Sequence, residues 1–219
     1  MSENREPSSV RLAGTLGIAG LCSGLILVGV YLATLPRIQQ NQAEAMQAAI
    51  YKVLPNASAI EPLALKGDQL VPFTGPAGAP TKERLIYLGK DARGDVVGYA
   101  VPAEGPGFQD TIKLLYGYDP SRRAVIGMEV LESRETPGLG DKIIFDPHFK
   151  ANFEELKVEP KLELVKKGEK TAPNQVDAIT GATISCRAVV SILNQSTQEW
   201  LPRIGDGASK TARVPGGQP

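Results

Sequence analysis

The sequence is poor in the residues that build metal centres and disulfide frameworks. Its 219 residues include two cysteines and one histidine. Two cysteines cannot form a disulfide framework or a four-cysteine zinc site, and a single histidine excludes a histidine-rich metal site. Net charge is also missing, because 24 lysines and arginines balance 24 aspartates and glutamates. We therefore expect no bound metal, and no nucleic acid bound through the release of counterions.

Charged residues are absent from Leu12 to Leu35, which reads LAGTLGIAGLCSGLILVGVYLATL. At about 1.5 Å per residue, a helix of this length covers the ~30 Å hydrocarbon core of a bilayer. A buried helix of a soluble protein would show a polar face, and the apolar part of a cleaved signal peptide would be only about 7–15 residues long. The sequence therefore predicts a retained transmembrane helix over residues 12–35, after a cytoplasmic tail of residues 1–11.

The basic residues around this span favour one orientation. Arg5 and Arg11 precede the span, whereas only Arg37 follows it closely. Because positive residues stay on the cytoplasmic side, we expect a single-pass protein of the inner (cytoplasmic) membrane with its C-terminal domain on the extracytoplasmic, periplasmic side. Cysteine usage agrees, since Cys186 would be the lone cysteine outside the membrane and could form no wrong intramolecular pair.

Residues 36–54 predict a stalk helix that docks on the domain. Its apolar residues recur at the spacing of one helical face: Met46, Ala49, Ile50, Val53 and Leu54. Pro36 is expected to close the span before this helix begins. Residues 55–82 are rich in Pro, Gly and Ala, and they predict a loop with room for one short strand.

Four apolar runs separated by turn residues predict the core of the domain. They are Leu85–Leu88, Val96–Val101, Thr111–Tyr118 and Ala124–Leu131. Their short connections imply antiparallel hairpins, because parallel strands need long crossovers. We expect a helix, a last strand, a second helix and a disordered tail to follow, at residues 145–156, 162–167, 187–204 and 205–219. The sequence therefore predicts an α+β domain over residues 55–204, with a largely antiparallel sheet and flanking helices.

One segment with chemical potential is Asp177–Cys186, DAITGATISC, directly before the second predicted helix. Thr180, Thr183 and Ser185 could each cap that helix, and the small residues Gly181 and Ala182 leave room for a ligand to approach the backbone. The start of a helix offers free N–H groups and the positive end of the helix dipole to a phosphate. Taken alone, the segment is most simply a capped helix.

A second segment is Ser133–Asp141, SRETPGLGD, which follows the fourth predicted strand. Gly138 and Gly140 suit positions of positive φ or close approach, and Pro137 stiffens the turn. The segment lacks the G-x-x-x-x-G-K-[ST] pattern of a nucleotide P-loop, and G-x-G alone does not indicate a Rossmann fold. Taken alone, this segment is a turn with a polar rim.

Together, ETPGLGDKI and D-x-x-TGAT behind one N-terminal span resemble the FMN-binding subunits of ion-translocating electron-transport complexes, in particular the G subunit of the Rnf complex. The resemblance covers nearly the whole chain. A related family is the C subunit of the sodium-translocating NADH:quinone oxidoreductase. Its chains tend to be longer, and its motif usually begins with Ser where this chain has Thr180.

The resemblance implies a covalent cofactor. In that family FMN is carried through a phosphoester on the last Thr of the motif, which corresponds to Thr183, and a separate flavin transferase makes the bond. A Thr hydroxyl is a weak nucleophile without a neighbouring base, and no His stands in the motif, which agrees with an external enzyme. Glu135, Thr136 and Leu139 match positions that line the isoalloxazine ring. The expected cofactor-binding residues are Asp177, Thr180, Gly181, Ala182, Thr183, Ser185, Glu135, Thr136, Gly138 and Leu139.

The resemblance also implies a function. The chain is expected to be the covalent-FMN electron carrier of a membrane-bound ferredoxin:NAD oxidoreductase that couples electron transfer to movement of Na⁺ or H⁺, with no substrate chemistry of its own. Its expected partners are the other subunits of the complex, the flavin transferase during maturation, and the membrane. The alternatives are a component of a sodium-translocating NADH:quinone oxidoreductase, and a non-catalytic anchored module for regulation or scaffolding. The intact TGAT motif argues against a module that has lost its flavin.

Overall fold

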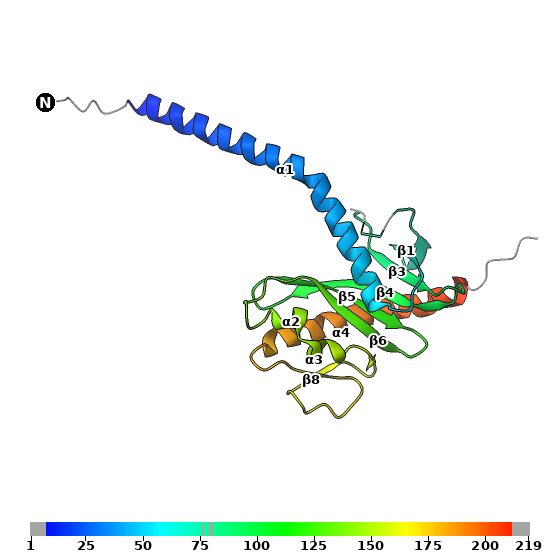
Figure 1. Ribbon diagram of the computed structural model, residues 1–219. Helices are drawn as coiled ribbons and strands as arrows, with labels where there is room; N and C mark the ends of the chain where they lie inside the picture. The colour runs from blue at the N-terminus through cyan, green and yellow to red at the C-terminus, as the bar shows by residue number, and fades with distance from the viewer. Residues whose placement is uncertain (1–7, 76, 79–80, 212–219) are drawn as a thin grey trace, which may run out of the picture. The chain divides into compact units, whose positions relative to one another are not determined.

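The computed structural model describes residues 8–75, 77–78 and 81–211 (Figure 1). The chain divides into two compact units, Met1–Gln42 and Ala43–Pro219. The first unit contains the N-terminal part of helix α1, and the second contains the last turns of α1, a large sheet and the remaining helices. All the residues predicted to bind the cofactor belong to the second unit.

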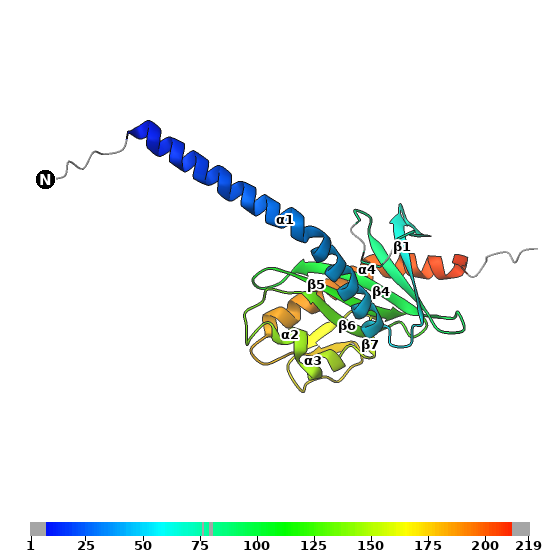
Figure 2. The same ribbon diagram turned by 45° about the horizontal axis from the view of Figure 1, so that its top comes forward.

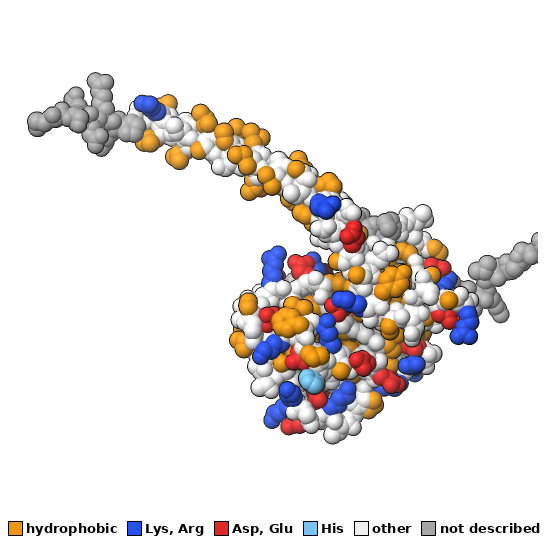
Figure 3. All heavy atoms as spheres, viewed as in Figure 1, with side chains coloured by type: hydrophobic (Ala, Val, Ile, Leu, Met, Phe, Trp, Pro, Cys, Tyr) orange, Lys and Arg blue, Asp and Glu red, His pale blue; other side chains and the backbone are white. Residues whose placement is uncertain are grey.

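Helix α1 runs from Ser9 to Val53 and contains the predicted span. It is long and apolar enough to cross a membrane by length and composition, because an 18-residue window has a mean hydropathy of 2.2 and is 0% buried. Hydrophobic side chains cover the N-terminal part of α1 in Figure 3. Pro36 lies inside the helix, so the predicted span and the predicted stalk form one continuous helix. A proline within a helix removes one backbone hydrogen bond, and the helix continues here despite that loss.

Seven strands form one sheet in the order β2-β1-β3-β4-β5-β6-β7, and every neighbouring pair is antiparallel. The strands are Ala59–Lys66 (β1), Gln69–Pro72 (β2), Leu85–Lys90 (β3), Val96–Pro106 (β4), Thr111–Asp119 (β5), Ala124–Glu132 (β6) and Leu156–Lys157 (β7). The four predicted hairpin strands are β3 to β6, slightly longer than predicted. The expectation of at most one strand in residues 55–82 is wrong, because β1 and β2 pair there as a hairpin.

Each face of the sheet buries one helix, because successive side chains of a strand point to opposite faces. On one face Leu85, Tyr87, Ala100 and Leu115 pack in a cluster with the end of α1, which contributes Ala49, Ile50, Val53 and Leu54. On the other face Ile86, Leu88, Val101, Leu114 and Tyr116 pack in a cluster with α4, Thr183–Thr211, which contributes Val189, Val190, Ile192, Leu193 and Trp200. Figure 2 shows α4 lying along the sheet. The stalk therefore docks on the domain as predicted.

The region between β6 and α4 differs from the prediction. The expected helix over residues 145–156 is two short helices, α2 (Lys142–Phe145) and α3 (Pro147–Ala151), followed by β7. Asp146 separates them because its side chain accepts hydrogen bonds from the N–H groups of His148 and Phe149, and Pro147 occupies the first turn. The predicted strand at residues 162–167 is β8 (Glu163–Val165), which pairs in parallel with an unpredicted strand, β9 (Gln175–Asp177).

Helix α4 is longer than predicted at both ends. It starts at Thr183, ahead of the predicted start at Arg187, and runs to Thr211. Residues 205–211 were expected to be disordered and are helical instead, whereas residues 212–219 lie outside the described residues. The α+β class, the antiparallel sheet and the flanking helices are confirmed.

Candidate functional site

The two predicted motif segments lie against each other, although they are far apart in the sequence. The Ser185 hydroxyl donates a hydrogen bond of 2.5 Å to Oε2 of Glu135. A Cβ on Gly181 would lie 3.7 Å from Cδ2 of Leu139. The structure therefore joins the loop after β6 to the start of α4, where the resemblance expected one cofactor site.

A tight turn presents Leu139 at the surface. Its N–H donates to the Thr136 carbonyl at 3.1 Å. Pro137 and Gly138 occupy the two central positions, and Gly138 has φ +75°. Proline followed by a residue of positive φ is typical of a type II turn. The turn leaves the Leu139 side chain 49% exposed.

A second turn of the same kind leads into α4. The Ala182 N–H donates to the Ile179 carbonyl at 3.0 Å, and Gly181 between them has φ +85°. Thr180 stands exposed on this turn. The first helical bond of α4 then runs from the Cys186 N–H to the Ala182 carbonyl at 2.9 Å. The backbone before Thr183 is thus fixed without any side-chain cap.

The start of α4 has free donors. Among the described residues, no acceptor meets the N–H groups of Thr183, Ile184 and Ser185. Ala182 has no side-chain oxygen to cap them, and no acidic residue lies in the first turn. Such a helix start attracts an anionic group, because the free N–H groups and the helix dipole both favour negative charge.

The three candidate hydroxyl groups differ in accessibility. Thr183 and Thr180 are exposed, whereas Ser185 is only 3% exposed and its hydroxyl proton is engaged by Glu135. The Thr183 hydroxyl forms no hydrogen bond in the described part of the chain. Exposure therefore separates both threonines from Ser185. Of the two threonines, Thr183 is the one in the helical turn with the free N–H groups.

Glu135 and Thr136 connect the site to a third segment, the β4–β5 connection. Glu135 is 5% exposed, and its Oε1 accepts hydrogen bonds from the N–H groups of Phe108 (2.7 Å) and Gln109 (3.2 Å). The Gln109 side-chain amide donates to the Thr136 hydroxyl at 2.9 Å. Sequence reasoning missed this segment, because residues 107–110 read GFQD and carry no motif that would assign them to the site.

Asp177 is placed differently from the rest of the motif. Its carboxylate accepts a hydrogen bond from the Gly168 N–H at 3.2 Å, and its own N–H donates to Asn152 Oδ1 at 3.0 Å. These contacts hold β9 to the β8–β9 connection and to the end of α3. They do not join Asp177 to the turn at Thr180.

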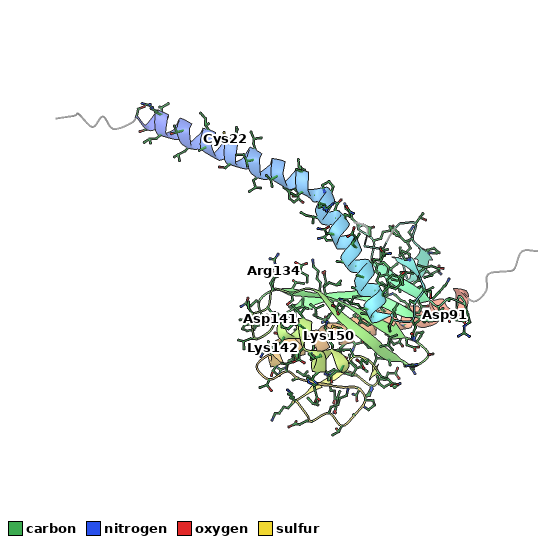
Figure 4. All side chains as sticks on the ribbon, in the orientation of Figure 1. Cys22, Asp91, Arg134, Asp141, Lys142 and Lys150 are labelled. Atoms are coloured by element: carbon green, nitrogen blue, oxygen red, sulfur yellow. The ribbon has the colours of Figure 1, made fainter. Side chains whose placement is uncertain are left out.

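The segments of the site also carry exposed apolar side chains and one unpartnered polar atom. Phe108 and Ile184 are 60% and 54% exposed, and they come from the same segments as Glu135's partners. Oδ1 of Asp141 is buried and has no hydrogen-bond partner among the described residues. Figure 4 shows Asp141 with Arg134 and Lys142 at one end of the domain. Such a set suits a ligand that has both an anionic end and a flat apolar part with hydrogen-bonding atoms.

Arg187 adds a positive charge to this surface. It lies four residues after Thr183 and therefore on the same face of α4. Its side chain is exposed, and it has no ion pair in the described part of the chain. The sequence signal for Arg187 is its i+4 spacing from Thr183.

Cys186 is a structural residue of the same turn. Its sulfur accepts a hydrogen bond from the Ile179 N–H at 3.4 Å, and its side chain is fully buried. Burial raises the pKa of the Cys186 thiol, and this outweighs the opposing hydrogen bond. The thiol is therefore poorly suited to redox chemistry.

A cavity of about 600 Å³ lies elsewhere, along the second half of α4. Its walls include Arg84, Leu85, Ile192, Glu199 and Trp200, and none of the predicted cofactor residues lines it. Although this cavity is more enclosed than the surface formed by the two motif segments, we assign the site to the motif surface. The free N–H groups, the exposed hydroxyl and the apolar side chains converge there.

Comparison with known proteins identifies the same region. A family model described as an FMN-binding domain matches residues 107–198. This range begins beside Phe108 and includes all ten residues predicted to bind the cofactor. Glu135 and its three hydrogen-bond donors therefore all lie within the matched domain.

Two sequence relatives span most of this chain. The G subunit of the ion-translocating oxidoreductase complex of Methanosarcina acetivorans is 34% identical over 196 residues, which are 90% of this chain and 95% of the relative. The G subunit of the Na⁺-translocating ferredoxin:NAD⁺ oxidoreductase complex of Acetobacterium woodii is 32% identical over 167 residues, which are 74% and 76% of the two chains. The similarity extends well beyond the domain that the family model matches.

A solved structure shares the fold. The crystal structure of NqrC from Shewanella oneidensis superposes with a TM-score of 0.66 at 18% identity, over 77% of this chain and 100% of the other. The C subunit of the Na⁺-translocating NADH-quinone reductase from Parabacteroides distasonis gives a TM-score of 0.60 at 19% identity, over 77% of this chain and 96% of the other. At this identity the likeness shows a common fold.

Proposed function

Because this chain belongs to the family of G subunits of ion-translocating oxidoreductase complexes, we propose that it carries electrons within such a complex through FMN bound covalently to Thr183. The observation that carries the proposal is the exposed Thr183 hydroxyl at a helix start with three free N–H groups. A phosphodiester keeps one negative charge, and these N–H groups and the helix dipole stabilise such a charge.

The residues around Thr183 fit FMN. The free N–H groups and Arg187 would hold the phosphate, and the exposed side chains of Leu139, Ile184 and Phe108 would pack on the apolar ring. When bound, FMN supplies the electron transfer, whereas the chain's own residues bind and orient it.

Attachment of FMN requires an external flavin transferase. A threonine hydroxyl becomes a competent nucleophile only with a neighbouring base. In the described part of the chain the Thr183 hydroxyl has no hydrogen-bond partner, so no base is in place to remove its proton. The exposure of Thr183 would let the transferase reach the hydroxyl.

The complex that we propose for this chain couples ferredoxin:NAD oxidoreduction to the movement of Na⁺ or H⁺. The relative from Acetobacterium woodii carries this activity in its name with Na⁺ as the ion. The fold likeness to NADH-quinone reductase subunits is compatible with a related complex, but the two sequence relatives described above are both G subunits.

Helix α1 would anchor the flavin domain at the outer face of the cytoplasmic membrane, beside the other subunits. The span from Leu12 to Leu35 contains no histidine and one cysteine, so it could ligate neither haem nor an iron–sulfur cluster. Electrons would therefore cross the bilayer through cofactors of partner subunits. Tethering would raise the effective concentration of the flavin at those partners.

The attachment site can be tested with three alanine variants of the full chain, made together with the flavin transferase. We expect Thr183→Ala to lose all covalent flavin, because the attacking oxygen is removed. Thr180→Ala is the matched control: it removes an exposed threonine three residues away and should keep the flavin. Ser185→Ala should also keep a covalent flavin, at reduced yield. Intact mass and in-gel flavin fluorescence measure each outcome.

Two results would contradict the assignment. Covalent FMN retained in Thr183→Ala would exclude Thr183, and its loss in Thr180→Ala or Ser185→Ala would name the alternative residue. Misfolding is not expected to confuse the Thr183→Ala and Thr180→Ala results, because both side chains are exposed and such substitutions usually change the free energy of unfolding by about 0.5 kcal/mol or less.

A further inference from the structure

We propose that Glu135 is a positioning residue that holds the three segments of the flavin site together and does not itself contact the flavin. The role rests on the proposed function, although the contacts that define it do not require a flavin. The Glu135 clasp consists of the Glu135 carboxylate, the N–H groups of Phe108 and Gln109, and the Ser185 hydroxyl.

The clasp joins elements that are distant in the sequence. Oε1 of Glu135 binds the β4–β5 connection, 26 and 27 residues earlier, at 3.2 and 2.7 Å. Oε2 binds the first turn of α4, 50 residues later, at 2.5 Å. An ionised carboxylate is an acceptor-only group, so it can satisfy all three donors at once. Without it, two backbone N–H groups would lie beside a 5% exposed position with no acceptor.

Two glycines close the carboxylate off from a ligand. A Cβ on Gly107 would collide with Oε1, and a Cβ on Gly140 would lie 2.7 Å from Oε2 and 2.6 Å from the Ser185 hydroxyl. Backbone therefore packs directly on both carboxylate oxygens, at distances that no larger residue would permit. Glu135 is enclosed by its own chain, whereas Leu139, four residues later, is exposed at the surface.

The clasp determines where the exposed side chains of the site stand. Phe108 is held by its own N–H, and Ile184 by its neighbour Ser185, so one carboxylate fixes both apolar side chains relative to Leu139. Thr183 lies in the same helical turn as Ser185. We infer that the clasp orders this surface before FMN is attached, so that the transferase meets a preformed acceptor.

Two conservative variants separate positioning from charge. Glu135→Gln keeps the length of the side chain: its carbonyl oxygen can still accept from Phe108 and Gln109, and its amide can donate to the Ser185 oxygen. Glu135→Asp keeps the charge but is one methylene shorter, so it cannot reach both sides. Positioning predicts that Gln replaces Glu better than Asp does, and a role of the charge predicts the reverse order.

The experiment uses the full chain in detergent, with Glu132→Gln as the matched control, since Glu132 is an exposed carboxylate nearby that pairs with Lys113 at 2.8 Å. The first measurement is the covalent flavin yield by intact mass after coexpression with the transferase. The second is hydrogen exchange at the Phe108 and Gln109 amides, measured in a Thr183→Ala background without flavin. We expect Glu135→Gln to stay within about twofold of the parent in both, and Glu135→Asp to exchange roughly tenfold faster and lose flavin yield to a similar degree.

The outcomes decide the proposal. A higher flavin yield in Glu135→Asp than in Glu135→Gln would overturn the positioning role, because the negative charge would then act on the flavin or the transferase. Unchanged exchange at Phe108 and Gln109 in Glu135→Asp would also overturn it. The exchange arm needs no flavin, so it remains decisive even if Thr183 were not the attachment residue. Conversely, Thr183→Ala could lose its flavin while both Glu135 variants keep normal flavin yields. This outcome would support the proposed function and contradict the proposed role of the Glu135 clasp.

Discussion

The middle and the first turn of helix α4 treat polar groups in opposite ways. In the middle, the Ser196 hydroxyl bonds the Tyr116 hydroxyl at 2.9 Å, Glu199 pairs with Arg84, and Arg203 pairs with Asp68 at 3.3 Å. In the first turn, the N–H groups of Thr183, Ile184 and Ser185 have no acceptor in the described part of the chain. The paired side chains in the middle of α4 therefore stabilise the domain, whereas the first turn keeps its backbone N–H groups available to a ligand.

Apolar side chains follow the same division. Trp200, in the second half of α4, is 2% exposed, and the Arg84 guanidinium lies 5.0 Å from the centre of its ring. Such a cation–π contact adds to the stability that burial of the indole provides. Ile184, in the first turn, is 54% exposed. Stability and binding thus occupy different turns of one helix, and mutations should separate the two properties.

The largest expected effect is that of Trp200→Ala on stability. Removal of a buried aromatic side chain should lower the free energy of unfolding by about 3–5 kcal/mol, because a cavity remains. The fraction of folded protein that carries covalent flavin should not change. Urea denaturation of the full chain in detergent and intact mass of the folded fraction measure the two quantities.

Ile184→Ala is the matched control in the first turn of α4 and should lower the free energy of unfolding by no more than about 0.5 kcal/mol. A loss below about 1 kcal/mol in Trp200→Ala, or a large loss in Ile184→Ala, would contradict the division of α4.

Tyr116→Phe tests the contribution of one hydrogen bond, the one between Tyr116 and Ser196 of α4. Tyr116 is fully buried, and loss of its hydrogen bond to Ser196 should cost about 1 kcal/mol of unfolding free energy at pH 7. Burial raises the pKa of the Tyr116 phenol, against the smaller opposing effect of the Ser196 hydrogen bond. A raised pKa contributes stability that is complete below the pKa of the unfolded tyrosine, about 10, and is lost as the pH rises toward the folded pKa.

The advantage of the parent protein over Tyr116→Phe should therefore narrow above about pH 10, because only the parent has this phenol to titrate. Stability measured from pH 7 to pH 11 checks the trend. An advantage that grows with pH would mean that the phenol ionises more easily in the folded protein than burial allows.

Local patterns made much of the fold predictable. Apolar runs bounded by turn residues predicted β3 to β6, and their short connections predicted antiparallel pairing, because both features act between near neighbours in the chain. The apolar residues of LELVKK predicted strand β8, whereas β9 has three residues and pairs with β8 in parallel across a long connection, so no local pattern marks β9. The helical residues 205–211 include two glycines, which disfavour a helix, and their conformation was for that reason predicted wrongly.

The candidate site divides in the same way. Thr183, Gly181 and Leu139 could be named from motifs, since the resemblance rests on those residues. The buried state of Glu135 could not be predicted, because the hydrogen bonds that define it come from Phe108, Gln109 and Ser185, all more than 25 residues away. Sequence thus predicted which segments carry the site, and only the packing of three segments showed which side chains face outward.

The smallest expected effect is that of Arg187, the exposed cation one turn after Thr183 in α4, on the rate of flavin attachment. If it stabilises the phosphate on Thr183, Arg187→Gln should slow flavin attachment by roughly two- to fivefold, the range for one exposed charge near a helix terminus. Arg187→Lys should keep most of the rate, because it keeps the charge. Arg122→Gln is the control: it removes an exposed arginine from the β5–β6 turn and should not change the rate of flavin attachment.

Salt tests whether the effect of Arg187 on flavin attachment is electrostatic. The difference in rate between Arg187→Gln and the parent should shrink between about 50 and 500 mM salt, because this change shortens the Debye length from roughly 14 Å to about 4 Å. Initial rates of flavin attachment at the two salt concentrations measure this. A difference that persists at high salt would show that Arg187 contributes through packing or a specific contact with the transferase, and that the free N–H groups alone provide the electrostatic stabilisation at this end of the helix.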